Sequence, residues 1–169
     1  MGNDDRMKKA RMVFYEDDIA SINEVLEGFI SASQATCCLL IDKEGHLVTQ
    51  RGHVKSIDTT SIAALVAGSF ASTKQVASML GETEFSVLFH QGQNENIHVS
   101  LVGERALLVI IFDDRTTIGM VRVYAEDVSG KLSTIFNEAE EKHAGDDPQM
   151  SKEYNDSAQQ KIEDFFSEE

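Results

Sequence analysis

The side chains of this chain that could carry chemistry do not form a recognisable catalytic or metal-binding pattern. Its histidines lie far apart in predicted strands and loops, without metal-ligand spacing: His46, His53, His90, His98 and His143. Ser61, Ser69 and Ser100 lack a nucleophile-elbow motif. The neighbouring Asp113 and Asp114 fall in a predicted turn, where helix capping accounts for them. No catalytic residue and no metal site are therefore predicted.

Nucleotide binding by the chain itself is also not expected. The sequence contains neither a GxxxxGKS/T loop nor a GxGxxG motif, so no glycine-rich backbone turn is available to hold phosphates. Arg51 and Arg115 lie at predicted loop edges, where a guanidinium group could reach a phosphate. A solvated arginine is the simpler interpretation of both, and we predict no cofactor.

The composition favours a protein or small-molecule partner. The 169 residues, 41% of them hydrophobic, fit one domain with tails. A net charge of −14 disfavours nucleic acid and anionic membranes, because phosphate binding needs a basic surface. Cys37 and Cys38 are adjacent in an apolar run, which favours burial over a disulfide. With no apolar run long enough to span a membrane, and with Arg6 where a myristoylation signal needs Ser or Thr, we expect a cytoplasmic protein.

Hydrophobic periodicity predicts an α+β domain with the element order αββαβββα. Helices are expected at 16–32, at 57–80 and from about 116 onward, and strands at 36–41, 46–50, 84–90, 96–102 and 105–112. The last strand, RALLVIIF, is nearly all apolar, which indicates a central strand covered on both faces.

The helix predicted over 57–80 has two sides that need to be covered. One side, including Leu65, Val66 and Val76, is expected to pack against the sheet. The opposite side is small and uncharged, with Lys74 the only charged residue between Thr59 and Gly81: Ala64, Ala67, Gly68, Ala71, Gln75, Ser78 and Met79. A partner surface is favoured over internal burial, because a domain of this size encloses few helices completely.

The ends of the chain differ in composition from the predicted domain. We expect a flexible lead over 1–13, the domain over 14–139, an acidic disordered linker over 140–156 and a partner-binding motif over 157–169. In that motif Ala158, Ile162, Phe165 and Phe166 have the spacing of a short amphipathic helix that binds in a groove. The alternatives are a helix that docks on its own domain, or no helix.

Three segments together resemble a Roadblock/LC7 domain: IDTTSIAALVAGSFAS, GETEFSVLFHQG and VIIFDDRTTIGMVR. The resemblance covers about 15–138, and the acidic tail ending in DFFSE makes it similar in particular to the bacterial MglB group. It implies a five-stranded antiparallel sheet between helices, with the central helix on one face and the terminal helices on the other. It also implies a homodimer in which the central helices meet.

The resemblance further implies a regulator without a catalytic site of its own. Proteins of the MglB group act as activating proteins for MglA, a small Ras-like GTPase of bacterial cell polarity and motility, by positioning the catalytic groups of the GTPase itself. The GTPase-binding surface would then include Ala64, Ala67, Gly68, Ala71, Lys74 and Gln75. The tail residues Ile162, Phe165 and Phe166 would contact the GTPase elsewhere and promote nucleotide exchange.

Two alternatives stay open. A Roadblock scaffold could assemble a complex without changing nucleotide turnover, although it would not need the aromatic end of the tail. A small enzyme or ligand-binding domain of similar layout is disfavoured, because no catalytic constellation is present.

Overall fold

A computed structural model of the chain describes residues 12–144. The elements run in the order α2 (Glu16–Ser33), β1 (Cys37–Asp42), β2 (Leu47–Gly52), α3 (Thr59–Met79), β3 (Val87–Gln91), β4 (Asn96–Val102), β5 (Ala106–Phe112) and α4 (Ile118–His143). This confirms the predicted order αββαβββα, with boundaries shifted by a few residues. None of the helices in the described part is long and apolar enough to cross a membrane.

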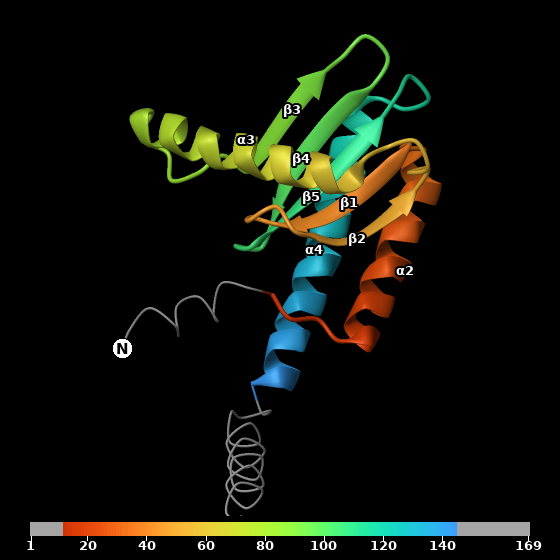
Figure 1. Cartoon of the computed structure of the whole chain (residues 1–169), viewed down its shortest axis with the longest axis vertical. Coiled ribbons are helices and arrows are strands. Elements are labelled where there is room, and N and C mark those ends of the chain that lie inside the picture. Colours follow the sequence, from red (N-terminus) through yellow and green to blue (C-terminus); the bar gives the residue numbers. More distant parts are fainter. Residues whose placement is uncertain (1–11, 145–169) are drawn as a thin grey trace, which may run out of the picture. The chain divides into compact units, whose positions relative to one another are not determined.

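The strands form one antiparallel sheet in the order β2-β1-β5-β4-β3 (Figure 1). β5 lies in the middle, paired with β1 through contacts such as Val109 opposite Leu39 and with β4 through Val109 opposite Val99. All seven residues of β5 are buried. The prediction of a central strand covered on both faces is therefore confirmed.

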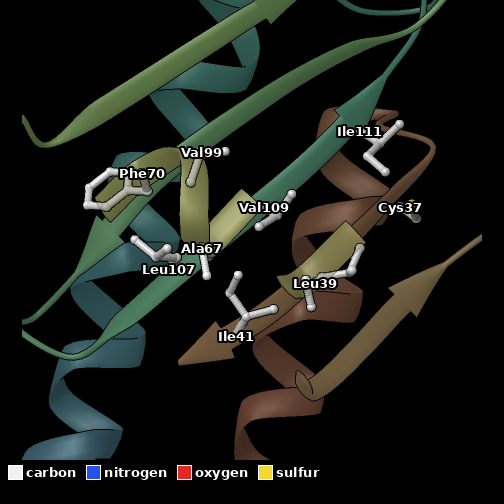
Figure 2. Packing of buried hydrophobic residues seen from close by; sticks show 10 residues of the cluster. Cys37, Leu39, Ile41, Ala67, Phe70, Val99, Leu107, Val109 and Ile111 are labelled. Carbon is white, nitrogen blue, oxygen red and sulfur yellow. The ribbon is translucent and has the colours of Figure 1, made fainter. Parts of the chain in front are cut away.

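α3 covers one face of this sheet. Successive residues of a strand point to opposite faces, so β1 and β5 each present every second residue to α3. Figure 2 shows that Ala67 and Phe70 of α3 lie over these side chains. The buried cluster comprises Cys37, Leu39, Ile41, Ala63, Ala67, Phe70, Val99, Leu107, Val109 and Ile111.

The side of α3 that packs on the sheet is only partly the predicted one. Its buried residues are Ala63, Ala67, Phe70 and Ala77, and Val66 packs partly buried against the same cluster as predicted, whereas Leu65 is 71% exposed and Val76 50% exposed. The prediction that Leu65 and Val76 face the sheet is wrong. Small alanines let the helix backbone lie close to the strands, and this close packing replaces the burial that the larger side chains would have given.

α2 and α4 cover the opposite face (Figure 1). α2 lies against β2 and β1, where the Thr49 hydroxyl donates a hydrogen bond of 2.6 Å to the side-chain oxygen of Asn23. The buried side chains of α2 and of the first part of α4 include Ile22, Leu26, Phe29, Val121, Ala125, Val128 and Leu132.

Cys37 and Cys38 are buried free thiols, as predicted, and burial raises their pKa values to about 11 and about 12.

The chain divides into two units, Met1–Ile135 and Phe136–Glu169. The last turns of α4 are the described part of the second unit. The predicted linker beyond Ala144 and the predicted tail motif, with Ile162, Phe165 and Phe166, lie outside the described residues, as does most of the predicted N-terminal lead.

A glycine is required at the end of β2. Gly52 has φ +94° and pairs with Cys37 of β1. A Cβ on Gly52 would lie 2.6 Å from the carbonyl oxygen of Thr36 and 2.7 Å from Cα of Cys37, and both neighbours are backbone atoms that cannot move aside cheaply. The β1–β2 pairing therefore depends on the absence of a side chain here.

We expect Gly52→Ala to lower the free energy of unfolding by at least about 2 kcal/mol, because positive φ and backbone overlap add. Gly28→Ala is the matched control, since Gly28 is an exposed helical residue of α2 with open space around its Cα. This control should raise the same free energy by roughly 0.5–1 kcal/mol. Urea denaturation of both variants measures the difference, and equal stability of the two would contradict the geometry of the hairpin.

One histidine is buried in the face covered by α4. His98 of β4 is 1% exposed, and its Nδ1 atom has no hydrogen-bond partner among the described residues. Burial, and after it the positive charge of Arg122, lower the pKa of His98 to about 4. The folded protein therefore holds this imidazole neutral at neutral pH.

The free energy of unfolding should decrease as the pH falls from about 6.5, the ordinary histidine pKa, toward about 4, because the unfolded chain binds a proton that the folded chain refuses. His98→Leu removes this contribution. The difference in free energy of unfolding between the original chain and the His98→Leu variant should therefore change by roughly 3 kcal/mol across that pH range. Denaturation series at several pH values measure this difference. A difference that does not vary with pH would show that His98 titrates normally in the fold.

Candidate functional site

α3 begins and ends as the sequence predicts. The Asp58 carboxylate accepts hydrogen bonds from the Ser61 backbone N–H at 3.1 Å and from the Ser61 hydroxyl at 2.7 Å, which satisfies the first turn. The bond from the Ser61 hydroxyl is also the main reason why the pKa of Asp58 is lowered. At the other end Gly81 has φ +80°, and its N–H donates to the Ser78 carbonyl oxygen.

The exposed surface of α3 includes two adjacent stripes, one of large apolar residues and one of small residues. The large stripe carries the apolar side chains Leu65, Val76 and Met79, which are 71%, 50% and 83% exposed. The small stripe carries Ala64, Gly68, Ala71 and Gln75, all exposed. Because α3 contains no acidic residue and Lys74 is its only cation, this surface is almost uncharged.

The predicted binding residues are distributed between this surface and the core. Ala64, Gly68, Ala71 and Gln75 form the small stripe, and the exposed Lys74 lies beside it. Ala67 is 4% exposed and belongs to the buried cluster against the sheet. Ala67 can therefore contact a partner only where the surface is hollowed.

Such a hollow, of about 120 Å³, lies along the edge of the small stripe. Its residues come from the β1–β2 turn, from α3 and from the segment before β3: Lys43, Ala67, Phe70, Ala71, Lys74 and Glu84. The floor is apolar and the rim carries two ammonium groups and one carboxylate. Lys43 donates to both carboxylate oxygens of Glu84, at 2.9 and 3.1 Å, which ties two loops together across the hollow.

The β1–β2 turn packs directly against α3. Gly45 has φ +97°, and a Cβ there would lie 3.0 Å from Cα of Ala64 and 3.4 Å from Cβ of Ala67. Sequence reasoning missed Lys43, Gly45 and Glu84 as parts of this surface. The DKEG turn gave a hairpin signal, but nothing in the sequence indicated that the hairpin reaches the helix.

The same turn brings three potential metal ligands together. Side-chain atoms of Asp42, Glu44 and His46 lie within 4.8 Å of one another. Hydrogen bonds of the turn account for this arrangement: one Asp42 oxygen accepts from the backbone N–H groups of Glu44 and His46, and the other lies 2.9 Å from Nδ1 of His46.

The two arginines considered above are engaged away from α3. The Arg115 Nε atom donates to Asp113 at 2.8 Å and its Nη2 atom donates to Thr36, and the hydrogen bond from Arg115 lowers the pKa of Asp113. Arg51 lies 3.1 Å from a Glu27 oxygen on α2. Both arginines are thus engaged by partners outside α3.

Comparison with known proteins agrees with this description. The model of the Roadblock/LC7 domain family matches residues 21–112. Comparison with curated proteins gives no match.

Solved structures of MglB proteins are similar over most of the chain. MglB of Myxococcus xanthus is 38% identical, with a TM-score of 0.71, over 75% of this chain and 96% of that one. The gliding protein MglB of Thermus thermophilus is 34% identical, with a TM-score of 0.72, over 76% and 97%. An MglB with a tetrameric arrangement is 32% identical, with a TM-score of 0.73, over 76% and 96%.

The fold, the family match and this identity over three quarters of the chain agree, and the protein belongs to the Roadblock/LC7 family.

Proposed function

We propose that this protein is a homodimeric activating regulator of an MglA-like small Ras-like GTPase in bacterial cell polarity and motility. The observation that carries the proposal is the almost uncharged, small-residue stripe of α3, exposed beside a preformed hollow. The similarity to MglB structures supports it. The cytoplasm, where such a GTPase works, is the proposed location.

The large stripe of α3 supports the homodimer. Leu65 and Met79 are more than two thirds exposed on one side of α3, and large exposed apolar side chains on one helix face are typical of a surface that another protein covers. β3 is an edge strand of the sheet and lies next to β4 alone among the strands of the described fold. A second copy that covers the large stripe leaves the small stripe available to the GTPase.

Activation would work by positioning. The GTPase-binding surface in this proposal comprises Ala64, Gly68, Ala71, Lys74 and Gln75, with Ala67 at the floor of the hollow. Small side chains let another backbone approach closely, and a rigid contact of this kind can hold the catalytic groups of the GTPase in place. No arginine of α3 takes part, because α3 contains none.

The tail motif is a second element of the proposal. Ile162, Phe165 and Phe166 would bind the same GTPase at another position and promote exchange, linked through the acidic segment that precedes them.

A Roadblock scaffold that assembles a complex without affecting nucleotide turnover is the alternative. Both functions use the same surface, so binding does not separate them. The two functions are distinguished by measuring GTP hydrolysis by the MglA-like GTPase of the same organism, once with this protein and once with a chain ending at Ala144. Stimulation by both forms assigns activation to the dimeric domain, and binding without stimulation favours the scaffold.

We expect Ala71→Arg to reduce the stimulation of GTP hydrolysis at least about tenfold, because a bulky cation on a close-packed surface costs more than about 1.4 kcal/mol of binding. Ala71 is exposed, so the fold should be unchanged. Ala20→Arg is the control, since Ala20 is an exposed alanine of α2 on the other face of the sheet. Equal stimulation by the two variants would contradict the proposed surface.

Leu65→Asp should shift the protein from dimer to monomer in sedimentation velocity at micromolar concentration, because it places a charge in an apolar contact. Its unfolding midpoint, extrapolated to low protein concentration, should stay close to that of the original chain. Met120→Asp on α4, where Met120 is 47% exposed, provides the comparison and should remain dimeric. A monomeric original chain, or a dimeric Leu65→Asp variant, would exclude the large stripe as the dimer contact.

A further inference from the structure

The hollow beside α3 has a more specific chemistry than the rest of the small stripe. We infer that it receives an acidic surface segment of the GTPase, with one aliphatic side chain on its apolar floor and a neighbouring carboxylate on Lys74. This inference rests on the proposed function and specifies which chemistry the partner must present.

The floor determines the apolar part of the occupant. Phe70 and Ala67 are 2% and 4% exposed, and the methyl group of Ala71 forms the adjoining wall. The volume of about 120 Å³ is comparable with that of apolar protein cavities that admit a benzene molecule, which are about 150 Å³. One valine, leucine or methionine side chain fits a space of this size, whereas a polar side chain would give up its hydrogen bonds to water on entering the hollow.

The rim determines the charged part. Glu84 is already neutralised by Lys43, with both carboxylate oxygens within 3.1 Å of the ammonium group. Lys74 has no ion-pair partner among the residues that the structure describes, and it is the single charged residue of α3. At the rim of the hollow, Lys74 is therefore the charged side chain that a partner can pair with.

Because the whole chain is acidic, Lys74 favours a partner carboxylate at one position on this surface. A net charge of −14 repels an acidic partner surface at long range, so a partner carboxylate is favoured only where a local cation meets it. A carboxylate seated on Lys74 fixes the register of the GTPase along α3. A segment displaced by one helical turn would place the same carboxylate against uncharged residues and lose the contact.

The hollow is held open before binding. The Lys43–Glu84 ion pair joins residues 41 positions apart in sequence, with side chains 32% and 20% exposed, so part of its geometry is shielded from solvent. The contact between Gly45 and Ala64 fixes the same turn on α3. A partner therefore loses little ordering entropy on entering this position.

The experiment uses the full chain and the MglA-like GTPase of the same organism loaded with a non-hydrolysable GTP analogue. Dissociation constants are measured by calorimetry at low and high salt for Lys74→Glu, for Glu84→Gln and for the original protein. Lys131→Glu is the control for the change in net charge, because it makes the same charge change on α4, across the sheet from α3; it also breaks the 2.8 Å ion pair of Lys131 with Asp127, which lies away from the proposed surface.

Lys74→Glu should weaken binding about 3- to 10-fold at low salt, since it replaces an attraction by a repulsion, and this difference from the original protein should shrink at high salt. Glu84→Gln keeps a side-chain oxygen that can accept a hydrogen bond from Lys43 but removes the negative charge beside it, so it should tighten binding by about twofold. Lys131→Glu should change the dissociation constant less than Lys74→Glu does. The opposite signs at Lys74 and Glu84 are the signature of an acidic occupant.

The remaining outcomes separate the two claims. If Ala71→Arg abolishes binding while Lys74→Glu behaves like Lys131→Glu, the α3 surface binds the GTPase but the acidic occupant is wrong. If Lys74→Glu tightens binding, a basic segment occupies the hollow and the inference is overturned. If the original protein does not bind the GTPase, the proposed function fails and the inference fails with it.

Discussion

The close approach of α3 to the sheet is the constraint on which the rest of this structure depends. The helix contacts the strands through Ala63, Ala67 and Ala77, with Phe70 as its one large buried side chain, and the β1–β2 turn approaches through Gly45. A larger side chain at Ala63 or Ala77, which are fully buried, would push the helix outward, because protein interiors are close-packed. Small residues therefore determine how the helix is seated.

This packing has a consequence for the surface. Since the alanine side of α3 is used for the core, the larger apolar residues Leu65, Val76 and Met79 remain outside. In a monomer these three side chains would stay exposed to water, although burying each of them could stabilise the protein by about 1.5–3 kcal/mol. The same distribution is consistent with a helix that contacts the sheet, a second copy and a further partner through three different sides.

The sequence predicted most of the fold because its signals were local. The continuous apolar runs of β1 and β5 identified these strands, and Asp58 and Gly81 marked the ends of α3. It failed on the side of α3 that packs against the sheet, because apolar residues surround this helix and periodicity alone cannot rank Leu65 below Ala63. The choice between them depends on the distance from helix to sheet, which is a tertiary property.

The exposure of the candidate site residues could also be predicted, for the same reason. The small stripe is a pattern within one helix, and five of the six predicted residues are exposed, with Ala67 the exception. The hollow depends on Lys43 and Glu84, which come from segments before and after the helix and meet only in the fold. Residues that act together across 41 positions leave no spacing signal in a single sequence.

The distribution of charge connects the packing of α3 to its proposed role. In a protein with a net charge of −14, the 21 residues of α3 include no acid and one lysine, and the nearby Glu84 is neutralised by Lys43. Uncharged small residues carry little desolvation cost, so a partner backbone can approach them at van der Waals distance. In the proposed complex, the orientation of the partner depends on the few charges at the rim of the hollow. The β1–β2 turn, which the small residues of α3 allow to lie against the helix, fixes the position of Lys43 at this rim. Close packing in the core and the proposed close contact with a partner thus both follow from the small side chains of α3.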